Sequence, residues 1–277
     1  MEEGSIKSKL DANAEFLARI LLKGSEALID SPRFCDGEMQ SREFLRNSLN
    51  DFWKLIIEFY SYIKNRDLLR RKLQMTQYER MEKGLLYDPG DPEIMNEQVP
   101  FQDRQWEFNQ LKPSDYEKKQ QYMHEVFAEC GENCYIELPL RANWGGHHLH
   151  FGSGIYANAN LTLVDDGHIY VGDKVMFGPN VIITTANHPV EPDLRARGLQ
   201  YNKDVRIGEN TWIGAGAILL PGICIGKNTV IGAGSVVTHD IPDDVVAVGN
   251  PCRVLRKISE RDREYFYKEH RIDWENL

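Results

Sequence analysis

The chain has 277 residues, enough for one large domain or two modest ones, and 42% hydrophobic with 27% charged residues is the composition of a soluble globular protein. A net charge of -9 argues against nucleic acid as the main partner, because phosphate binding needs a basic surface. The lack of a long apolar run, the acidic N-terminus and five scattered cysteines favour a cytoplasmic protein with reduced thiols over a membrane or secreted one.

The first part of the chain, residues 1–74, predicts an extra N-terminal helical segment. Apolar residues recur there at three- and four-residue steps, which is typical of an amphipathic helix: Phe52, Leu55, Ile56, Phe59, Tyr60 and Ile63. We expect this stripe to pack on another helix. The alternative is binding to a membrane surface, for which the later Arg70-Arg71-Lys72 would supply positive charge.

Residues 75–131 predict a helical cap made of two or three short helices. Thr76 and Ser114 are each followed three residues later by a glutamate, which is the pattern of a helix N-cap. Between them, Gly84 and the sequence DPGDP (88–92) predict a turn-rich connection.

A six-residue repeat runs without a slip from Ile207 to Pro242. Its first position is always a branched aliphatic residue, and its fifth is small or β-branched. The first positions are Ile207, Ile213, Leu219, Ile225, Ile231 and Val237, and the fifth positions are Thr211, Ala217, Ile223, Thr229, Ser235 and Ile241. Offsets of four and six are both even, so in a strand both positions point to the same side, whereas a helix would scatter them.

These hexads predict a mainly β fold, a parallel β-helix with three hexads to each triangular coil. An ordinary β-sandwich is the alternative, but it would not hold a six-residue register over six units. We place the β-helix at 132–258, with earlier coils beginning at Phe151 and Val171 and a two-residue excess near Asp166. The polar stretch 188–206 must loop out of the wall, and 259–277 predicts a C-terminal helical tail.

Three segments resemble the galactoside and maltose O-acetyltransferases, a hexapeptide-repeat family: IYANANLTLVDD (155–166), TTANHPVEPDLRARG (184–198) and VGNPCRVLRKI (248–258). The segment MTQYERMEKGLLYDPGDPE (75–93) is similar to the helical cap of the maltose enzymes. The resemblance covers about residues 75 to 271 and leaves 1–74 outside. It implies a left-handed β-helix, a homotrimer, acetyl-CoA as co-substrate and a sugar as acceptor, with no metal.

His188 is the candidate for the general base. Transfer of an acetyl group to a sugar hydroxyl needs a base with a pKa near 7, and His188 lies in the extruded loop. The resemblance gives it the family's catalytic role; the alternative is a histidine that only ties the loop to the coil. His147, His148 and His150 raise the different possibility of a zinc site, but two adjacent histidines would point to opposite faces of a strand.

Asn158, Asp166 and Tyr156 are the matching candidates in the earlier coils. By resemblance, Asn158 steadies the oxyanion formed on the acetyl-CoA thioester, which places it at the cofactor as well. Asp166 would accept hydrogen bonds from sugar hydroxyls, and Tyr156 would line the same pocket. The alternative for Asn158 is a structural asparagine ladder at a corner of the coil.

The remaining cofactor contacts also come from the resemblance. Arg253 and Arg256 match the family's phosphate-binding pair, and Thr238 matches a further phosphate contact. His239 replaces the family's lysine and Ala215 replaces a serine, so both contacts are weakened. Ala233 and Trp212 complete this coenzyme A groove: the first contacts the pantetheine arm, and the second lies along the groove.

The acceptor contacts depart furthest from the family. An aspartate of the cap aligns near Pro89, so Asp88 or Asp91 would serve in its place, and a contact of the first coil falls at Asn143 or Trp144. Gln200 stands where the galactoside enzyme has an apolar residue. We therefore expect an acetyl-CoA-dependent sugar O-acetyltransferase whose acceptor stays open. Two alternatives are an antibiotic O-acetyltransferase of the same fold and a non-catalytic trimeric scaffold.

Overall fold

The computed structural model describes residues 75–277 and four positions before them, namely Asn47, Asn50, Lys54 and Ile57, which are helical and exposed. Residues 75–277 form a compact unit of their own. The residues of the predicted apolar stripe, from Phe52 to Ile63 at three- and four-residue steps, lie outside the described residues.

Three helices form the cap: α3 (Gln77–Glu82), α4 (Pro92–Phe108) and α5 (Tyr116–Val126). The predicted N-cap at Thr76 is confirmed, because its hydroxyl accepts the Glu79 N–H at 3.1 Å while the Glu79 carboxylate accepts the Thr76 N–H at 2.9 Å. The predicted N-cap at Ser114 is wrong. Asp115 precedes α5 instead, and its carboxylate accepts the N–H of Lys112, three residues earlier, rather than one from the helix.

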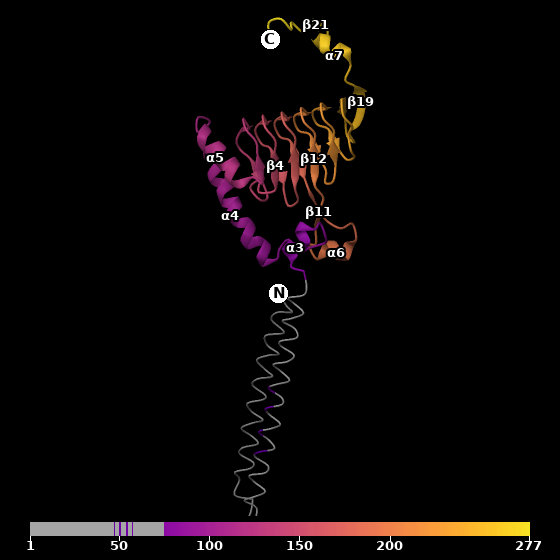
Figure 1. The fold of residues 1–277 in the computed structure, drawn as a ribbon. Helices are drawn as coiled ribbons and strands as arrows, with labels where there is room; N and C mark the ends of the chain where they lie inside the picture. The colour runs from indigo at the N-terminus through magenta and orange to yellow at the C-terminus, as the bar shows by residue number, and fades with distance from the viewer. Residues whose placement is uncertain (1–46, 48–49, 51–53, 55–56, 58–74) are drawn as a thin grey trace, which may run out of the picture. The chain divides into compact units, whose positions relative to one another are not determined.

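Three parallel sheets form the β-helix (Figure 1). The first contains β1 (Glu129–Cys130), β4 (Leu149–Phe151), β7 (Ile169–Val171), β12 (Val205–Ile207) and β15 (Cys224–Ile225). The second contains β2 (Tyr135–Ile136), β5 (Tyr156–Ala157), β8 (Met176–Phe177), β13 (Trp212–Ile213), β16 (Val230–Ile231) and β18 (Val245–Val248), and ends on the antiparallel β19 (Arg253–Lys257). The third contains β3 (Arg141–Ala142), β6 (Thr162–Val164), β9 (Ile182–Thr184), β14 (Ile218–Leu219) and β17 (Val236–Val237). The predicted parallel β-helix is confirmed, and it starts at Glu129 rather than at residue 132.

The interior contains both of the repeat positions singled out in the sequence. Every first-position residue from Ile207 to Val237 is at most 3% exposed, and every fifth-position residue from Thr211 to Ile241 is at most 5% exposed. The buried hydroxyls have partners, as Thr211 Oγ1 donates to the Gly226 carbonyl at 2.9 Å. A Cβ at Gly208 would overlap the backbone of Lys227 in the next coil, so this corner requires glycine.

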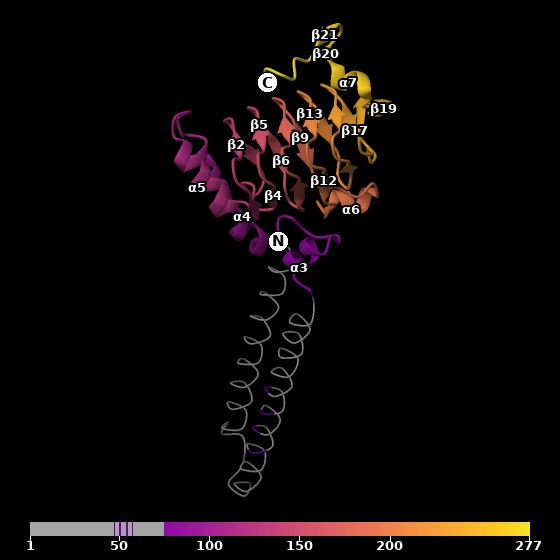
Figure 2. The same cartoon turned by 45° about the horizontal axis from the view of Figure 1, so that its top comes forward.

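Coil length varies along the chain, as the sequence predicts. Ile207 pairs with Ile225, 18 residues away, whereas Phe151 pairs with Val171, 20 residues away, which confirms the two-residue excess. Ile183 pairs with Leu219, 36 residues on, because an extra loop leaves the wall between them. That loop is a hairpin of β10 (Ala186–Asn187) and β11 (Tyr201–Asn202), with α6 (Pro192–Ala196) between the strands. Figure 2 shows α6 beside the coils.

The prediction of a helical tail at 259–277 is wrong. Only α7 (Glu260–Glu264) is helical, and β20 (Tyr265–Tyr267) and β21 (His270–Arg271) then form an antiparallel hairpin. The physical reason lies in the sequence Tyr-Phe-Tyr, because aromatic residues favour strands. Lys268 adopts a φ of 48° at the turn, which ends any helix there.

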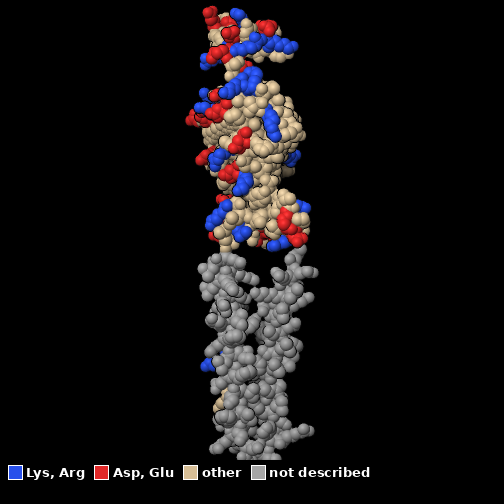
Figure 3. Space-filling model, turned by 90° about the vertical axis from the view of Figure 1, so that its right-hand side faces the viewer, with Lys and Arg blue, Asp and Glu red and all other residues tan. Residues whose placement is uncertain are grey.

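Charges of both signs are mixed on the face of residues 75–277 drawn in Figure 3. No helix within the described part of the chain is long and apolar enough to cross a membrane.

Candidate active site

His188 lies where β10 ends, on the exposed side of the extruded loop. Its Nδ1 is 2.9 Å from the carbonyl oxygen of Leu199. A carbonyl can only accept, so Nδ1 carries a proton, and in the neutral tautomer that this bond selects the lone pair lies on Nε2. The side chain is therefore held in the tautomer that a general base toward a hydroxyl requires.

Asp166 is 8% exposed and is held by two amides. Asn143 donates to one carboxylate oxygen at 2.8 Å, and Gln200 donates to the other at 3.3 Å. Burial raises the pKa of Asp166, while the amides of Asn143 and Gln200 oppose that rise by stabilising the charged form. The carboxylate thus lies at the base of the His188 loop with its hydrogen-bonding geometry fixed.

Asp165, the neighbour of Asp166, is a residue that sequence reasoning missed. It is fully buried, and burial raises its pKa to about 7. Its two carboxylate oxygens accept backbone N–H groups from Trp144 at 2.8 Å and Gly146 at 2.9 Å. Asp165 therefore holds the turn that carries Asn143. The sequence signal that could have pointed to Asp165 is the acidic pair Asp165-Asp166 at the place where the coil has two extra residues.

The structure separates the acceptor candidates. Asn143 is exposed and contacts Asp166, whereas Trp144 is 0% exposed, so only Asn143 of that pair can meet a substrate. Gln200 is 7% exposed and is engaged with Asp166 and Tyr87.

The two cap aspartates both serve the local turn. The Asp88 carboxylate accepts the Gly90 N–H at 2.9 Å, and the Asp91 carboxylate accepts the Glu93 N–H at 2.9 Å as the N-cap of α4. Neither contacts His188 or Asp166 through any hydrogen bond of the described residues.

Asn158 follows β5 at a different corner of the coil. Its Oδ1 accepts the N–H of Ala159 at 2.8 Å, so the amide NH₂ remains as a donor for a ligand. The asparagine ladder is formed instead by Asn160 and Asn180, whose side chains are 3.0 Å apart. Tyr156 lies beside Asn158, is 38% exposed and stacks on Tyr135.

The face of the coil that contains β6 lies between Asn158 and Asp166. Such a face, about four extended residues long, spans about 13 Å. Asn158 and His188 of one chain therefore stand at separate corners.

The candidate coenzyme residues lie on the second sheet, at the corner that follows it, and after β17 of the third sheet. Tyr156, Met176 and Trp212 are aligned in successive strands, and Trp212 is 50% exposed. Ala215 and Ala233 are both exposed and occupy the same corner in consecutive coils, where the Gly234 N–H donates to the Ala215 carbonyl at 2.8 Å.

His239 and Arg253 line one pocket of about 260 Å³, and Thr238 Oγ1 is 2.7 Å from His239 Nδ1. Arg256 is already engaged, because its guanidinium makes two bonds to the Asp262 carboxylate at 2.7 and 2.8 Å. The structure therefore places Arg253, but not Arg256, beside His239.

The histidines raised as a possible zinc site have separate partners. His147 stacks on Phe101, with ring centroids 4.0 Å apart, and His148 Nδ1 donates to the Asp165 carbonyl at 2.6 Å. Burial lowers the pKa of His148 to about 4, so it stays neutral. His150 lies on the first sheet, 3.2 Å from the Glu129 carboxylate and 2.9 Å from His168.

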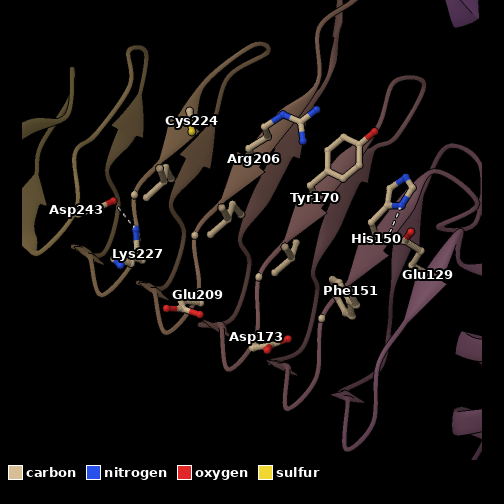
Figure 4. A pocket seen from close by; sticks show the side chains of 17 residues that line it. Glu129, His150, Phe151, Tyr170, Asp173, Arg206, Glu209, Cys224, Lys227 and Asp243 are labelled. Carbon is tan, nitrogen blue, oxygen red and sulfur yellow. Dashed lines mark hydrogen bonds and ion pairs between the residues drawn. The ribbon is translucent and has the colours of Figure 1, made fainter.

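A groove of about 740 Å³ follows the outer face of the first sheet (Figure 4). At one end of the groove, an arginine, a tyrosine and a histidine are stacked in a row. Arg206 lies 3.9 Å above the ring of Tyr170, and His150 stacks on that ring at 4.3 Å. None of the candidate catalytic or coenzyme residues lines this groove.

Comparison with known proteins identifies the family. A family described as bacterial transferase hexapeptide (six repeats) matches residues 204–239, and the maltose acetyltransferase hexapeptide capping motif matches 80–131. The galactoside O-acetyltransferase of Lactococcus lactis is 53% identical over 200 residues, which are 72% of this chain and 97% of that protein. The chain belongs to the maltose and galactoside O-acetyltransferase family.

Solved structures of the family agree. The structure of a galactoside acetyltransferase in complex with coenzyme A is 40% identical in sequence, with a TM-score of 0.69. The match covers 72% of this chain and 100% of that chain. The structure of a maltose O-acetyltransferase from Clostridium difficile is 42% identical in sequence, with a TM-score of 0.65. The match covers 67% of this chain and 98% of that chain. The family's fold is thus present over nearly the full length of these relatives, and both the cap and the repeat predicted from the sequence are confirmed.

Proposed function

We propose that this protein transfers the acetyl group of acetyl-CoA to a hydroxyl of a sugar in the cytoplasm. The observation that carries the proposal is the His188 imidazole, held by the Leu199 carbonyl with Nε2 available, on the loop whose base contains Asp166. The relatives named as galactoside and maltose O-acetyltransferases, one of them bound to coenzyme A, support the donor and the acceptor class.

The reaction is a direct transfer in a ternary complex. His188 Nε2 takes the proton of the sugar hydroxyl, whose oxygen attacks the thioester carbonyl carbon. The Asn158 NH₂ donates to the oxyanion of the tetrahedral intermediate. The intermediate then expels the coenzyme A thiolate, which recovers the proton from the imidazolium, so the products are an acetyl ester and free coenzyme A.

The site requires more than one copy of the chain. His188 and Asn158 stand at separate corners of one β-helix, and a base and an oxyanion donor must reach the same carbonyl. In a homotrimer, the His188 corner of one subunit would face the Asn158 corner of its neighbour. The exposed apolar column Tyr156–Met176–Trp212 on the Asn158 side supports such contact between subunits.

The acceptor is expected to be a sugar that need not be a galactoside, because Gln200 stands where the galactoside enzyme has an apolar residue, and its buried amide donates to Asp166 and Tyr87. A panel of methyl galactoside, maltose, glucose and chloramphenicol, assayed with acetyl-CoA by thiol release, tests the proposal. Transfer to at least one sugar is the expected result. Transfer to chloramphenicol alone would identify an antibiotic-modifying enzyme, and no transfer to any hydroxyl would favour a scaffold.

Arg253→Ala should raise the KM for acetyl-CoA about tenfold or more and change kcat little. The reason is that a guanidinium–phosphate bond is made equally in the ground and transition states. Steady-state kinetics with acetyl-CoA measures the change, and acetyl-pantetheine, which lacks the nucleotide phosphates, is the control donor. A large loss with acetyl-pantetheine would place Arg253 at the chemistry instead. The same test on Arg256→Ala shows whether Asp262 releases that side chain to the coenzyme.

A further inference from the structure

Tyr87 is buried where the cap meets the loop that carries His188. The residue is 1% exposed, and its ring packs with Met81, Ile94 and Trp144, which joins α3 and α4 to the first coil. A ring buried to this extent cannot touch a sugar. Any influence of Tyr87 on acetyl transfer must therefore pass through its neighbours.

The backbone of Tyr87 is paired with the loop. Its N–H donates to the Gln200 carbonyl at 2.9 Å, and the Gln200 N–H donates to the Tyr87 carbonyl at 3.0 Å. Leu199, the residue before Gln200, is the one whose carbonyl accepts the Nδ1 proton of His188 at 2.9 Å. The cap thus holds the loop backbone that in turn sets the tautomer and orientation of the imidazole.

The hydroxyl of Tyr87 is bound to two side-chain amides, one of which contacts the Asp166 carboxylate and the other the Asp166 backbone. It donates to Asn202 Oδ1 at 3.3 Å and accepts from Gln200 Nε2. Gln200 Nε2 also donates to the Asp166 carboxylate at 3.3 Å, and Asn202 Nδ2 donates to the Asp166 backbone carbonyl at 2.8 Å. Burial raises the pKa of Tyr87, with the charge of Asp166 adding to the effect, so the hydroxyl keeps its proton and remains a donor.

We infer that Tyr87 is a positioning residue of the acetyl-transfer site, through which the cap sets the orientation of both His188 and Asp166. The inference rests on the proposed function and deepens it, because it makes the cap part of acceptor recognition. Packing alone would be served equally by phenylalanine. A buried hydroxyl is costly unless it is bonded, and here its bonds go to Gln200, which holds the Asp166 carboxylate, and to Asn202, which holds the Asp166 backbone carbonyl.

Tyr87→Phe in the full chain tests the inference, since it keeps the ring and removes only the hydroxyl. With whichever of methyl galactoside and maltose the unmodified enzyme acetylates, kcat/KM for the acceptor should fall about tenfold, the effect of losing one buried hydrogen bond and loosening Gln200. The KM for acetyl-CoA should not change, because the hydrogen bonds of Tyr87 and Gln200 go to none of the coenzyme candidates. The informative result is a lower kcat/KM for the acceptor together with an unchanged KM for acetyl-CoA.

Asn109→Ala is the matched structural control. Asn109 ties the end of α4 to Leu140 with two hydrogen bonds of 2.8 and 2.9 Å and has no bond to the loop. Its loss should lower Tm and leave kcat/KM for the acceptor unchanged. If Tyr87→Phe behaves in the same way, Tyr87 only docks the cap and the inference is overturned.

Gln200→Leu is the second variant, and it leaves Tyr87 in place if Tyr87→Phe does not fold. Alone, it should also lower kcat/KM for the acceptor without changing the KM for acetyl-CoA, and a normal acceptor kcat/KM would contradict the inference. Combined, the two substitutions should cost less than the product of their separate effects, because they break one shared network. Fully multiplicative effects would show that they act independently. An unmodified enzyme that acetylates no hydroxyl would overturn the proposed function itself, whereas an active one with a normal Tyr87→Phe variant would overturn only the positioning role.

Discussion

His188→Ala is expected to lower kcat by about 10² to 10⁴-fold, because loss of a general base removes that much from a proton-transfer step. Binding of acetyl-CoA should persist, since the coenzyme candidates Trp212 and Arg253 lie on other elements. Thiol release measures kcat, and calorimetry of acetyl-CoA binding shows that the donor site is intact.

The matched control for this variant is His124→Ala. His124 is an exposed histidine on α5, outside the loop, and its removal should leave both kcat and KM unchanged. A His188→Ala enzyme that keeps more than about a tenth of the normal kcat would show that His188 is not the base, because that loss is below the general-base range.

The β-helix could be predicted because its interior imposes one rule at every coil. Inward positions recur at even offsets, and a Cβ at a corner such as Gly208 would overlap the next coil, so the pattern is strict and local in sequence. The same rule predicted the extruded loop, since the inward positions Ile183 and Ile207 lie on opposite sides of it, and the structure pairs Ile183 with Leu219 across the gap. The structure of the tail, residues 259–277, could not be predicted in this way, because a short exposed segment has no interior that imposes a pattern of inward residues.

The network around Asp166 could not be predicted, because it depends on contacts between distant residues. Tyr87 and Asn202 are separated by 115 residues, and neither local sequence contains a pattern that predicts their contact. The sequence likewise does not decide whether Asn143 or Trp144 contacts the acceptor. The structure decides it, because Trp144 is fully buried. Resemblance located Asp166 and His188 as single residues, whereas the buried amides and the fully buried Asp165 appear only once the coils are stacked.

Asn158→Ala is expected to lower kcat by about 10² to 10³-fold, the usual cost of removing one oxyanion donor. The KM for acetyl-CoA should change much less, because the oxyanion exists only in the transition state and the intermediate. Asn160→Ala is the matched control, since Asn160 belongs to the ladder with Asn180 and its loss should reduce stability without lowering kcat.

Mixing the two inactive chains tests whether the site is shared between subunits. When His188→Ala and Asn158→Ala chains assemble in one oligomer, some interfaces join an intact His188 from one chain to an intact Asn158 from the other. Random equal mixing should restore about a quarter of the normal activity, because one of the four possible pairings at a subunit interface is complete. Two separately inactive chains that stay inactive after co-refolding into mixed trimers would place both residues of each site on one chain, against the separation of their corners by the β6 face.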